Sequence, residues 1–429
     1  MKITVLTNFY EWKALCERPV FDQSQLEEKV QGIIESVRQK GDEALNNYSL
    51  AFDGLRIENF LVTKEEIEFA VSKVNQELKD AIQLAKLNIE KFHASQLEES
   101  KVIETSIGVK CWRKSVGIEK VGLYIPGGTA PLFSTILMLG IPAQIADCKE
   151  VILCSPPQKD GRLNPAILYA ANLVGITKIY KIGGAQAIAA MAFGTAQVPQ
   201  VYKIFGPGNQ YVTKAKELLQ REGVAIDMPA GPSEVLIVAD ASCNPSFVAA
   251  DLLSQAEHGA DSQVILLSDS LNIIQEVMKE LEQQLEQLPR KEIAEKALKN
   301  SRAIQLDSIE ECISFSNNYA PEHLIIASEN ADKYVDSIVN AGSVFLGNYS
   351  CESAGDYASG TNHTLPTNGY AKNYSGVSVE SFVRKITFQS LSKKGIQNIG
   401  PAIELMAEAE ALFAHKNAVT LRLKSIQND

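Results

Sequence analysis

The feature that most constrains the fold is the presence of two series of short apolar runs, separated by segments of helical pattern. The first series contains VGLYIP, EVILCSP, KIYKIGG and VYKIFGPG, and the second contains EVLIVAD, SQVILLS, HLIIASE and GSVFLG. Strands that lack polar alternation and that alternate with helices are typical of parallel sheets covered on both faces. The pattern therefore predicts two α/β units.

The segments on either side of these series have a different pattern. The first hundred or so residues are predicted to be helical, with a capping box at 63–66 (TKEE). Apolar residues then recur at steps of three and four, which marks one buried helix face. His93 lies at the end of that helix and is interpreted as a surface or C-cap histidine. The last fifty residues are too short for a domain, so we expect them to pack on another subunit or on the α/β body.

Length and charge narrow the class of protein. A chain of 429 residues is too long for one compact core and predicts two or three domains. The formal charge of −11 argues against a nucleic-acid or anionic-membrane surface, because both need a positive footprint. The chain starts without a signal-like apolar run, and no later run is long enough to span a bilayer. We therefore expect a cytoplasmic enzyme or binding protein with no nucleic-acid or membrane partner.

The cysteines give no metal or redox motif. Seven are present and none forms a CxxC pair, which argues against a thiolate zinc site or a redox pair. Reduced thiols in a cytosolic setting fit all seven.

Four glycine-rich turns follow one another within about 110 residues. They are IPGGTAP (125–131), IGGAQA (182–187), FGPGNQ (205–210) and PAGPSE (229–234). Turns between strands and helices in α/β sheets are where ligands bind, because amides at helix N-termini point outward there. None of the four fits GxGxxG, and tight turns also need glycine for backbone reasons. A phosphate or dinucleotide ligand and plain turns both remain open on this ground.

Histidine and acidic residues mark the second half of the chain. Gln255 and His258 stand three residues apart, on one face of a predicted helix, where a solvated polar face is the alternative. Glu322 and His323 directly precede the apolar run LIIA. Adjacent side chains of an extended segment point opposite ways, so both reach one pocket only if the backbone turns, which Pro321 permits.

Two further polar segments lie nearer the C-terminus. Asp356 and His363 fall in a glycine- and serine-rich loop, and His415 follows Glu410 by five residues in the tail. Imidazole, carboxylate and amide oxygen are suitable ligands for Zn²⁺ or another borderline divalent ion. Spacing alone does not bring four segments spread over 160 residues to one point.

Eight segments of the chain together resemble one known family. They are VGLYIPGGTAPLFSTILML, GGAQAIAA, KIFGPGN, AIDMPAGPSEVL, DLLSQAEHG, PEHLI, SAGDYASGTNH and AHKNAVTLR. In their residues and in their order along the chain, these segments resemble the histidinol dehydrogenase family over nearly the whole length. Thr364 stands where that family's pattern has valine, a departure outside the site positions.

The resemblance implies a set of site residues. The zinc ligands would be Gln255, His258, Asp356 and His415, and the acid/base pair would be Glu322 and His323. Substrate contacts would come from Ser233, Gln255, His258, His323, Asp356, Glu410 and His415. Contacts to NAD⁺ would come from Tyr124, Gln186 and Asn209.

The resemblance also implies an activity and an assembly. The reaction would be the four-electron oxidation of L-histidinol to L-histidine through bound L-histidinaldehyde, the last steps of histidine biosynthesis, with two NAD⁺ and one Zn²⁺ per subunit. Zinc would hold the substrate's nitrogen atoms, His323 would accept the alcohol proton and Glu322 would activate water. The protein would be a homodimer whose C-terminal tail crosses to the partner, which places Glu410 and His415 in the neighbouring site.

The expected fold class is α/β, with two incomplete Rossmann-like domains, a helical N-terminal segment and a small C-terminal tail domain. The N-terminal segment would cover 1–22 and the dimerisation tail 377–429. A discontinuous domain of 23–123 and 233–376 would carry most zinc and acid/base residues. Residues 124–232 would form an inserted NAD-contacting domain.

Two other functional classes stay open. A zinc-dependent lyase or hydrolase would need the metal and the acid/base residues but no nucleotide, so NADH formation distinguishes it from a dehydrogenase. A zinc-stabilised binding protein would gain nothing from a Glu322–His323 pair, and metal removal would unfold it. His363 has two interpretations, as a pocket-lining residue or as a hydrogen-bonded structural one.

Overall fold

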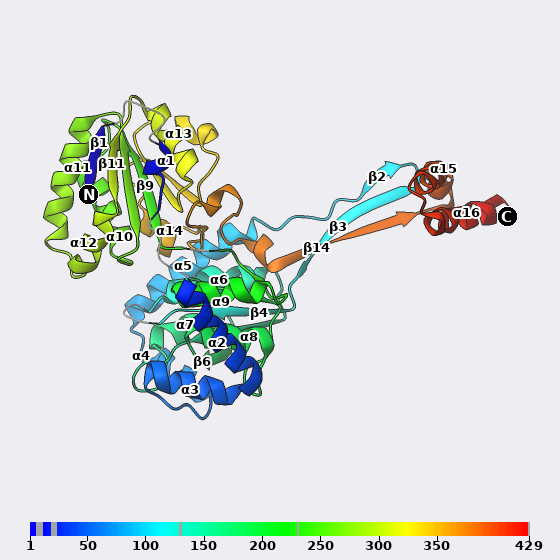
Figure 1. Ribbon diagram of the computed structural model, residues 1–429, viewed down its shortest axis with the longest axis horizontal. Helices are drawn as coiled ribbons and strands as arrows, with labels where there is room; N and C mark the ends of the chain where they lie inside the picture. The colour runs from blue at the N-terminus through cyan, green and yellow to red at the C-terminus, as the bar shows by residue number, and fades with distance from the viewer. Residues whose placement is uncertain (6–11, 19–23, 128–130, 230, 428–429) are drawn as a thin grey trace.

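The chain folds into two α/β units and a long arm (Figure 1). The computed structural model describes residues 1–5, 12–18, 24–127, 131–229 and 231–427. Parts of the predicted turns 125–131 and 229–234 therefore lie outside the described residues. Among the described helices, none combines the length and the apolar character needed to cross a membrane.

The first unit is built on a five-stranded parallel sheet in the order β6-β5-β4-β7-β8. Its strands are β4 (Lys120–Tyr124), β5 (Glu150–Ser155), β6 (Lys178–Lys181), β7 (Lys203–Phe205) and β8 (Ala225–Ile226). The helices that alternate with them are α6 (Phe133–Ile145), α7 (Pro165–Leu173), α8 (Gly184–Phe193) and α9 (Gln210–Gln220). The strand order reverses between β4 and β7, so the turns that follow these two strands part at the carboxyl edge of the sheet, where such folds bind ligands.

Four N-terminal helices complete this unit. They are α2 (Ser24–Lys40), α3 (Asp42–Asp53), α4 (Lys64–Lys73) and α5 (Gln76–Ala94). Thr63 and Glu66 make both hydrogen bonds of the predicted capping box. Helix α5 buries Ile82, Ala85 and Ile89 against α6, as the periodicity predicts, but Phe92 at the end of the predicted face is exposed.

The second unit is built on a six-stranded parallel sheet in the order β1-β11-β10-β9-β12-β13. Its strands are β1 (Lys2–Val5), β9 (Glu234–Ala239), β10 (Gln263–Ser268), β11 (Arg302–Gln305), β12 (His323–Ala327) and β13 (Ser343–Leu346). Its α-helices are α1 (Trp12–Leu15), α10 (Pro245–Ala256), α11 (Leu271–Leu285), α12 (Lys291–Lys299), α13 (Ile309–Tyr319) and α14 (Glu352–Tyr357). Short 3₁₀ helices follow: η2 (Ala331–Ser337), η3 (Tyr370–Lys372) and η4 (Val379–Phe382). Both sheets are parallel with apolar interiors, as the unbroken apolar runs predict.

The packing of the N-terminal third differs from the domain division expected from sequence. That division groups 23–123 with the second unit, but α2, α4 and α5 pack on the helices of the five-stranded sheet. Residues 2–5 of the expected helical segment form a strand that pairs with β11 at the edge of the second sheet. An apolar helix face can be buried against either sheet, so its periodicity does not say which one it covers.

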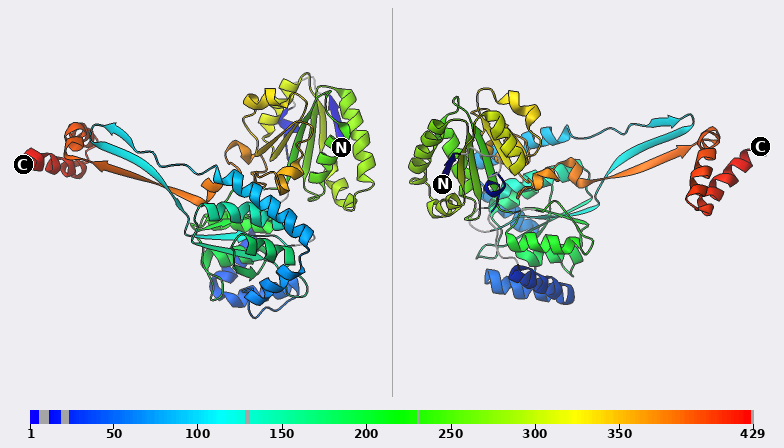
Figure 2. Two further views of the ribbon diagram at one scale, coloured as in Figure 1. Left: turned by 180° about the vertical axis from the view of Figure 1, so that it is seen from behind. Right: turned by 45° about the horizontal axis from the view of Figure 1, so that its top comes forward.

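The arm projects away from both units (Figures 1 and 2). It is an antiparallel ribbon of β2 (Ile103–Ser106), β3 (Val109–Gly117) and β14 (Val383–Leu391). Helices α15 (Lys393–Ala409) and α16 (Phe413–Gln427) lie at its far end. The tail therefore packs neither on the five-stranded nor on the six-stranded unit of its own chain.

Candidate active site

The Glu322–His323 pair lies where α13 gives way to β12. Ala320 ends the helix in the left-handed conformation with φ 57°, Pro321 follows, and the chain bends at Glu322 before the strand begins at His323. The two side chains consequently lie next to each other, with Glu322 Oε2 3.7 Å from His323 Nδ1. The turn that Pro321 permits is therefore present. Both side chains are buried, with 6% and 4% of their surface exposed.

Glu322 is held by groups from the neighbouring strand and helix. Its Oε2 accepts a hydrogen bond from the backbone N–H of Glu234 at 2.8 Å and a longer one from Gln255 Nε2 at 3.4 Å. Burial raises the pKa of Glu322 to about 7, while His323 and the Glu234 amide oppose that shift. A carboxyl with such a pKa exchanges a proton near neutrality, as a general base or acid requires.

The two ring nitrogens of His323 have different neighbours. Its Nδ1 lies 3.2 Å from both the Glu234 carbonyl and Gln255 Nε2. Its Nε2 lies 3.6 Å from Asp356 Oδ1 and makes no hydrogen bond within the described residues. Burial lowers the pKa of His323, but the carboxylates of Glu352, Glu322 and Asp356 outweigh it and raise the pKa to about 10.

A group of potential metal ligands lies next to this pair. Donor atoms of His258, Glu352 and Asp356 all lie within 4.8 Å of one another. Gln255 lies in the last turn of α10, whereas His258, expected on the same helix face, follows the end of the helix. The amide nitrogen of Gln255 faces Glu322 and His323, which leaves its oxygen for another ligand. Imidazole, carboxylates and an amide oxygen form a donor set that suits Zn²⁺. The structure thus brings His258 and Asp356, two of the four ligands expected from the resemblance, close together, and it places Gln255 beside the Glu322–His323 pair.

Glu352 is a member of this group that the sequence analysis missed. It is 1% exposed, its Oε2 has no hydrogen-bond partner among the described residues, and burial raises its pKa to about 8. Its place four residues before Asp356 on one helix face was the signal that could have identified it.

Two expected site residues lie elsewhere. Glu410 and His415 belong to the end of α15 and to α16, at the tip of the arm, and both are exposed. Ser233 directly precedes β9, and its carbonyl accepts a hydrogen bond from the backbone of Gln263 at 3.2 Å. The arm therefore holds Glu410 and His415 away from the Glu322–His323 pair of their own chain (Figure 1).

The three residues expected at NAD⁺ lie along the carboxyl edge of the five-stranded sheet. Tyr124 ends β4, and its hydroxyl accepts a hydrogen bond from the Gly184 N–H at 3.1 Å. Gln186 is buried in the first turn of α8, and its Oε1 has no partner within the described chain. Asn209 caps α9 by accepting from the amides of Tyr211 and Val212. Tyr124 and Asn209 therefore also serve the fold, whereas Gln186 carries an unpaired oxygen.

A buried ion pair that the sequence analysis missed fixes the turn beside Tyr124. Gly206 has φ 126°, and a Cβ there would come within 2.0 Å of the Tyr124 carbonyl oxygen, so this close approach requires glycine. Lys216 Nζ donates to the Gly206 carbonyl at 2.9 Å, and Asp227 Oδ2 accepts from the Gly206 N–H at 2.8 Å. Lys216 and Asp227 also form an ion pair with each other.

His363 connects the two units. Its Nδ1 lies 2.9 Å from the Asp356 carbonyl and its Nε2 lies 3.0 Å from the hydroxyl of Thr135, in the first turn of α6. Burial is the main cause that lowers its pKa. Both nitrogens are thus engaged, which favours the structural interpretation of this histidine. The contact also shows that the carboxyl edge of the first sheet meets the metal-ligand group.

His93 differs from its expected surface position. Its side chain is fully buried, with Nδ1 2.8 Å from the Ile89 carbonyl and Nε2 3.3 Å from Asn362 Nδ2. Asn362 comes from 269 residues further along the chain, so the helix pattern alone does not reveal its approach. All seven cysteines are free thiols, as expected.

The fold and the site together define a class of protein. Two parallel α/β units meet, with the reversal of strand order in the first sheet on one side and the buried Glu322–His323 pair beside potential metal ligands on the other. That combination is typical of a dehydrogenase.

Comparison with known proteins identifies the family. The family model for histidinol dehydrogenase matches residues 16–423. A histidinol dehydrogenase of Bacteroides thetaiotaomicron is 58% identical over 100% of both chains, and one of Xylella fastidiosa is 54% identical over 94% of each. The crystal structure of histidinol dehydrogenase from Elizabethkingia anophelis superposes with a TM-score of 0.98 at 62% identity, covering 100% of this chain and 99% of that one. The chain belongs to the histidinol dehydrogenase family.

Membership has direct consequences for function. The chain is an oxidoreductase, it uses NAD, and its reaction belongs to histidine biosynthesis. The alternative of a lyase or hydrolase without NAD finds no support.

Proposed function

We propose that the buried Glu322–His323 pair carries out the proton transfers in a two-step oxidation of L-histidinol to L-histidine. Histidinol, two NAD⁺ and one water would give histidine, two NADH and three protons, with histidinaldehyde held in the site between the steps. The observation that carries the proposal is the position of this pair, which is buried with Glu322 Oε2 3.7 Å from His323 Nδ1. Two proposed metal-ligand side chains lie beside His323, Gln255 at 3.2 Å and Asp356 at 3.6 Å. NAD⁺ supplies the hydride acceptor for both oxidations.

A divalent ion, Zn²⁺ by the chemistry of its donors, is part of the proposal at one site per subunit. Four side chains would hold it: Gln255, His258 and Asp356 of one chain, together with His415 of the partner subunit. The fit rests on the convergence of His258 and Asp356 donor atoms within 4.8 Å. When bound, the ion would hold the substrate's nitrogen atoms, orient its carbinol carbon and offset the charge of the surrounding carboxylates.

The two catalytic side chains would divide the work. His323 would accept the alcohol proton on Nε2, the nitrogen that faces Asp356 and makes no hydrogen bond within the described chain. Because the surrounding carboxylates outweigh burial and raise the pKa of His323 to about 10, this step would need a bound cation to offset their charge and leave the ring neutral. Glu322 would take a proton from the water that attacks the aldehyde, since its pKa of about 7 suits a base at neutral pH. Ser233, at the start of the neighbouring strand, would contact the substrate.

The cofactor would bind at the carboxyl edge of the five-stranded sheet. Tyr124 and Asn209 flank the point where the strand order reverses, and Gln186 lies at the start of α8 on the same edge. Support comes from the general behaviour of such sheets, which bind nucleotides at this reversal, and from the unpaired Gln186 oxygen.

A homodimer with exchanged tails is the assembly that we propose. The arm places Glu410 and His415 far from the pocket of their own chain, and the tip exposes large apolar side chains. These are Leu405, Met406, Phe413 and Leu421, between 59% and 70% exposed. An apolar surface on an extended arm favours burial against another chain. We place the enzyme in the cytoplasm, where NAD and amino-acid precursors are available.

An NADH assay tests the proposal. The zinc-loaded enzyme with limiting L-histidinol should form two NADH per histidinol, chelation should abolish the signal, and added Zn²⁺ should restore it. One NADH per histidinol with release of free aldehyde would contradict the two-step reaction. Activity that survives complete metal removal would contradict the metal site alone.

A further inference from the structure

The backbone of Glu234 contacts both proposed catalytic side chains through two successive peptide groups. Its N–H donates to Glu322 Oε2 at 2.8 Å, and its carbonyl lies 3.2 Å from His323 Nδ1. With a proton on Nδ1, the ring donates to this carbonyl and keeps a lone pair on Nε2, the nitrogen proposed as the base. The backbone position of one residue, Glu234, therefore bears on the orientation of both catalytic side chains.

The side chain of Glu234 is itself held on both oxygens. Arg18 Nε pairs with Oε1, Arg18 Nη2 donates to Oε2 at 2.9 Å, and the backbone N–H of Asn368 donates to Oε1 at 3.1 Å. The ion pair is largely shielded from water, with side-chain exposures of 15% for Arg18 and 3% for Glu234. Shielding strengthens such a two-bond contact and gives it a fixed geometry.

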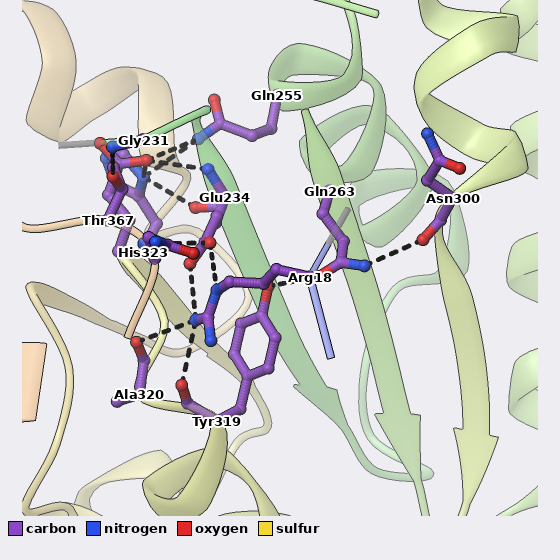
Figure 3. Close-up of polar contacts among 12 residues, drawn as sticks. Arg18, Gly231, Glu234, Gln255, Gln263, Asn300, Tyr319, Ala320, His323 and Thr367 are labelled. Atoms are coloured by element: carbon purple, nitrogen blue, oxygen red, sulfur yellow. Dashed lines mark hydrogen bonds and ion pairs between the residues drawn. The ribbon is translucent and has the colours of Figure 1, made fainter. Parts of the chain in front are cut away.

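The same guanidinium holds the turn that leads to Glu322. Arg18 Nη2 donates to the Tyr319 carbonyl at 3.0 Å and approaches the Ala320 carbonyl at 3.4 Å. The guanidinium carbon Cζ of Arg18 lies 3.9 Å from the centre of the Tyr319 ring. Figure 3 shows Arg18 between Glu234 and these two residues.

We propose that Arg18 is a positioning residue for the acid/base pair. Arg18 joins the start of β9 to the turn before β12. It therefore fixes Glu322 and His323 relative to the Glu234 backbone, which orients both side chains. The inference rests on the proposed function, because it assumes that Glu322 and His323 transfer protons. Arginine suits the task because one planar group donates to a carboxylate and to carbonyls at once, which an ammonium does with less geometric control.

Kinetics of Arg18→Met in the full-length, zinc-loaded enzyme test the proposal. We expect kcat to fall at least about tenfold, since small displacements of reacting groups reduce turnover strongly. The KM for histidinol and the bound zinc should stay within about twofold, because Arg18 contacts none of the proposed ligands in this structure. Arg18→Lys should recover part of the lost kcat.

A neutral pair separates positioning from stability, and covers the case in which Arg18→Met fails to fold. Arg18→Met with Glu234→Gln removes both charges and keeps an acceptor for the Asn368 amide, so the melting temperature should recover. We expect kcat to stay low in this double variant. Recovery of kcat to within about twofold of the parent would overturn the proposal, as would an unchanged kcat in Arg18→Met.

Two further variants complete the design. Arg38→Met is the matched control: Arg38 also pairs with a glutamate, Glu222 at 2.8 Å, and lies over an aromatic ring, but in the other unit. Its kcat should equal that of the parent. Glu322→Gln distinguishes the two levels of inference. An impaired Glu322→Gln beside normal Arg18 variants overturns the role of Arg18 alone, and a fully active Glu322→Gln overturns the proposed function together with it.

Discussion

His323 Nε2 lies 3.6 Å from Asp356 Oδ1, at the boundary between the proposed acid/base pair and the proposed metal ligands. The separation is longer than a hydrogen bond, so Asp356 does not occupy this nitrogen. It is short enough for the carboxylate to stabilise the ring once it is protonated. We therefore expect Asp356 to affect proton transfer as well as the proposed metal binding.

Mixed dimers test whether each site is shared between two chains. Dimers of His415→Ala with Gln255→Ala subunits should regain activity, because half of the random dimers are heterodimers with one intact site. Recovery should approach about a quarter of the parent's activity in the mixture. Steady-state NADH formation after joint refolding measures it.

The matched control for this experiment mixes His415→Ala with Glu410→Ala. Both substitutions lie on the arm, so no shared site receives an unaltered arm and activity should stay absent. Equal behaviour of the two mixtures would contradict exchange of the tails.

Loss of the buried Lys216 ammonium group in the first unit should impair the use of NAD⁺ more than the use of histidinol. Lys216→Met leaves Asp227 buried without its partner and frees the turn at Gly206 beside Tyr124. We expect unfolding to become easier by about 3–5 kcal/mol and the KM for NAD⁺ to rise. Urea denaturation and initial rates at varied NAD⁺ measure the two effects.

Lys214→Met provides the comparison for that variant. Lys214 lies on the same helix and pairs with the more accessible Glu217, so its loss should be almost neutral. A similar stability loss in both lysine variants would show that the buried pair has no special role.

The pH dependence of stability should carry a contribution from Asp251. This side chain on α10 is partly buried, and burial raises its pKa from 3.8 to about 7. The unfolded carboxyl ionises first, so between about pH 4 and pH 7 the folded state binds more protons and loses stability as the pH rises. Asp251→Asn removes this loss, and its advantage over the parent should grow across that window and then level off.

Urea midpoints of the two proteins at pH 4, 6 and 8, at one protein concentration, measure this difference. Asp160→Asn, at an exposed loop position, controls for the loss of a surface charge. A constant difference between Asp251→Asn and the parent at all three values would refute the assignment.

Much of the fold could be predicted from the sequence, because unbroken apolar runs and helix periodicity reflect burial directly. Pro321 permits the turn that brings Glu322 and His323 together, but the sequence left open whether the backbone turns there. The position of this pair in the fold was not predictable. It lies at the amino ends of β9 and β12, whereas ligands in such sheets usually lie at the carboxyl ends.

Long-range partners account for most of what the sequence left out. Arg18 reaches Glu234 across 216 positions, and no local pattern marks either residue as one of a pair. The buried position of His93 depends in the same way on Asn362. Periodicity reports which face of an element is apolar, but it does not report which distant segment meets that face.

The most direct test of the central claim compares histidinol and histidinaldehyde as substrates for Glu322→Gln. The substitution keeps the size of the side chain and removes its capacity to take a proton, so oxidation of the aldehyde, which needs activated water, should fall by about 100-fold. The first oxidation, measured as NADH formed from histidinol in a single turnover, should fall much less, because His323 is proposed to accept that proton. Equal losses with the two substrates would contradict the division of work between Glu322 and His323.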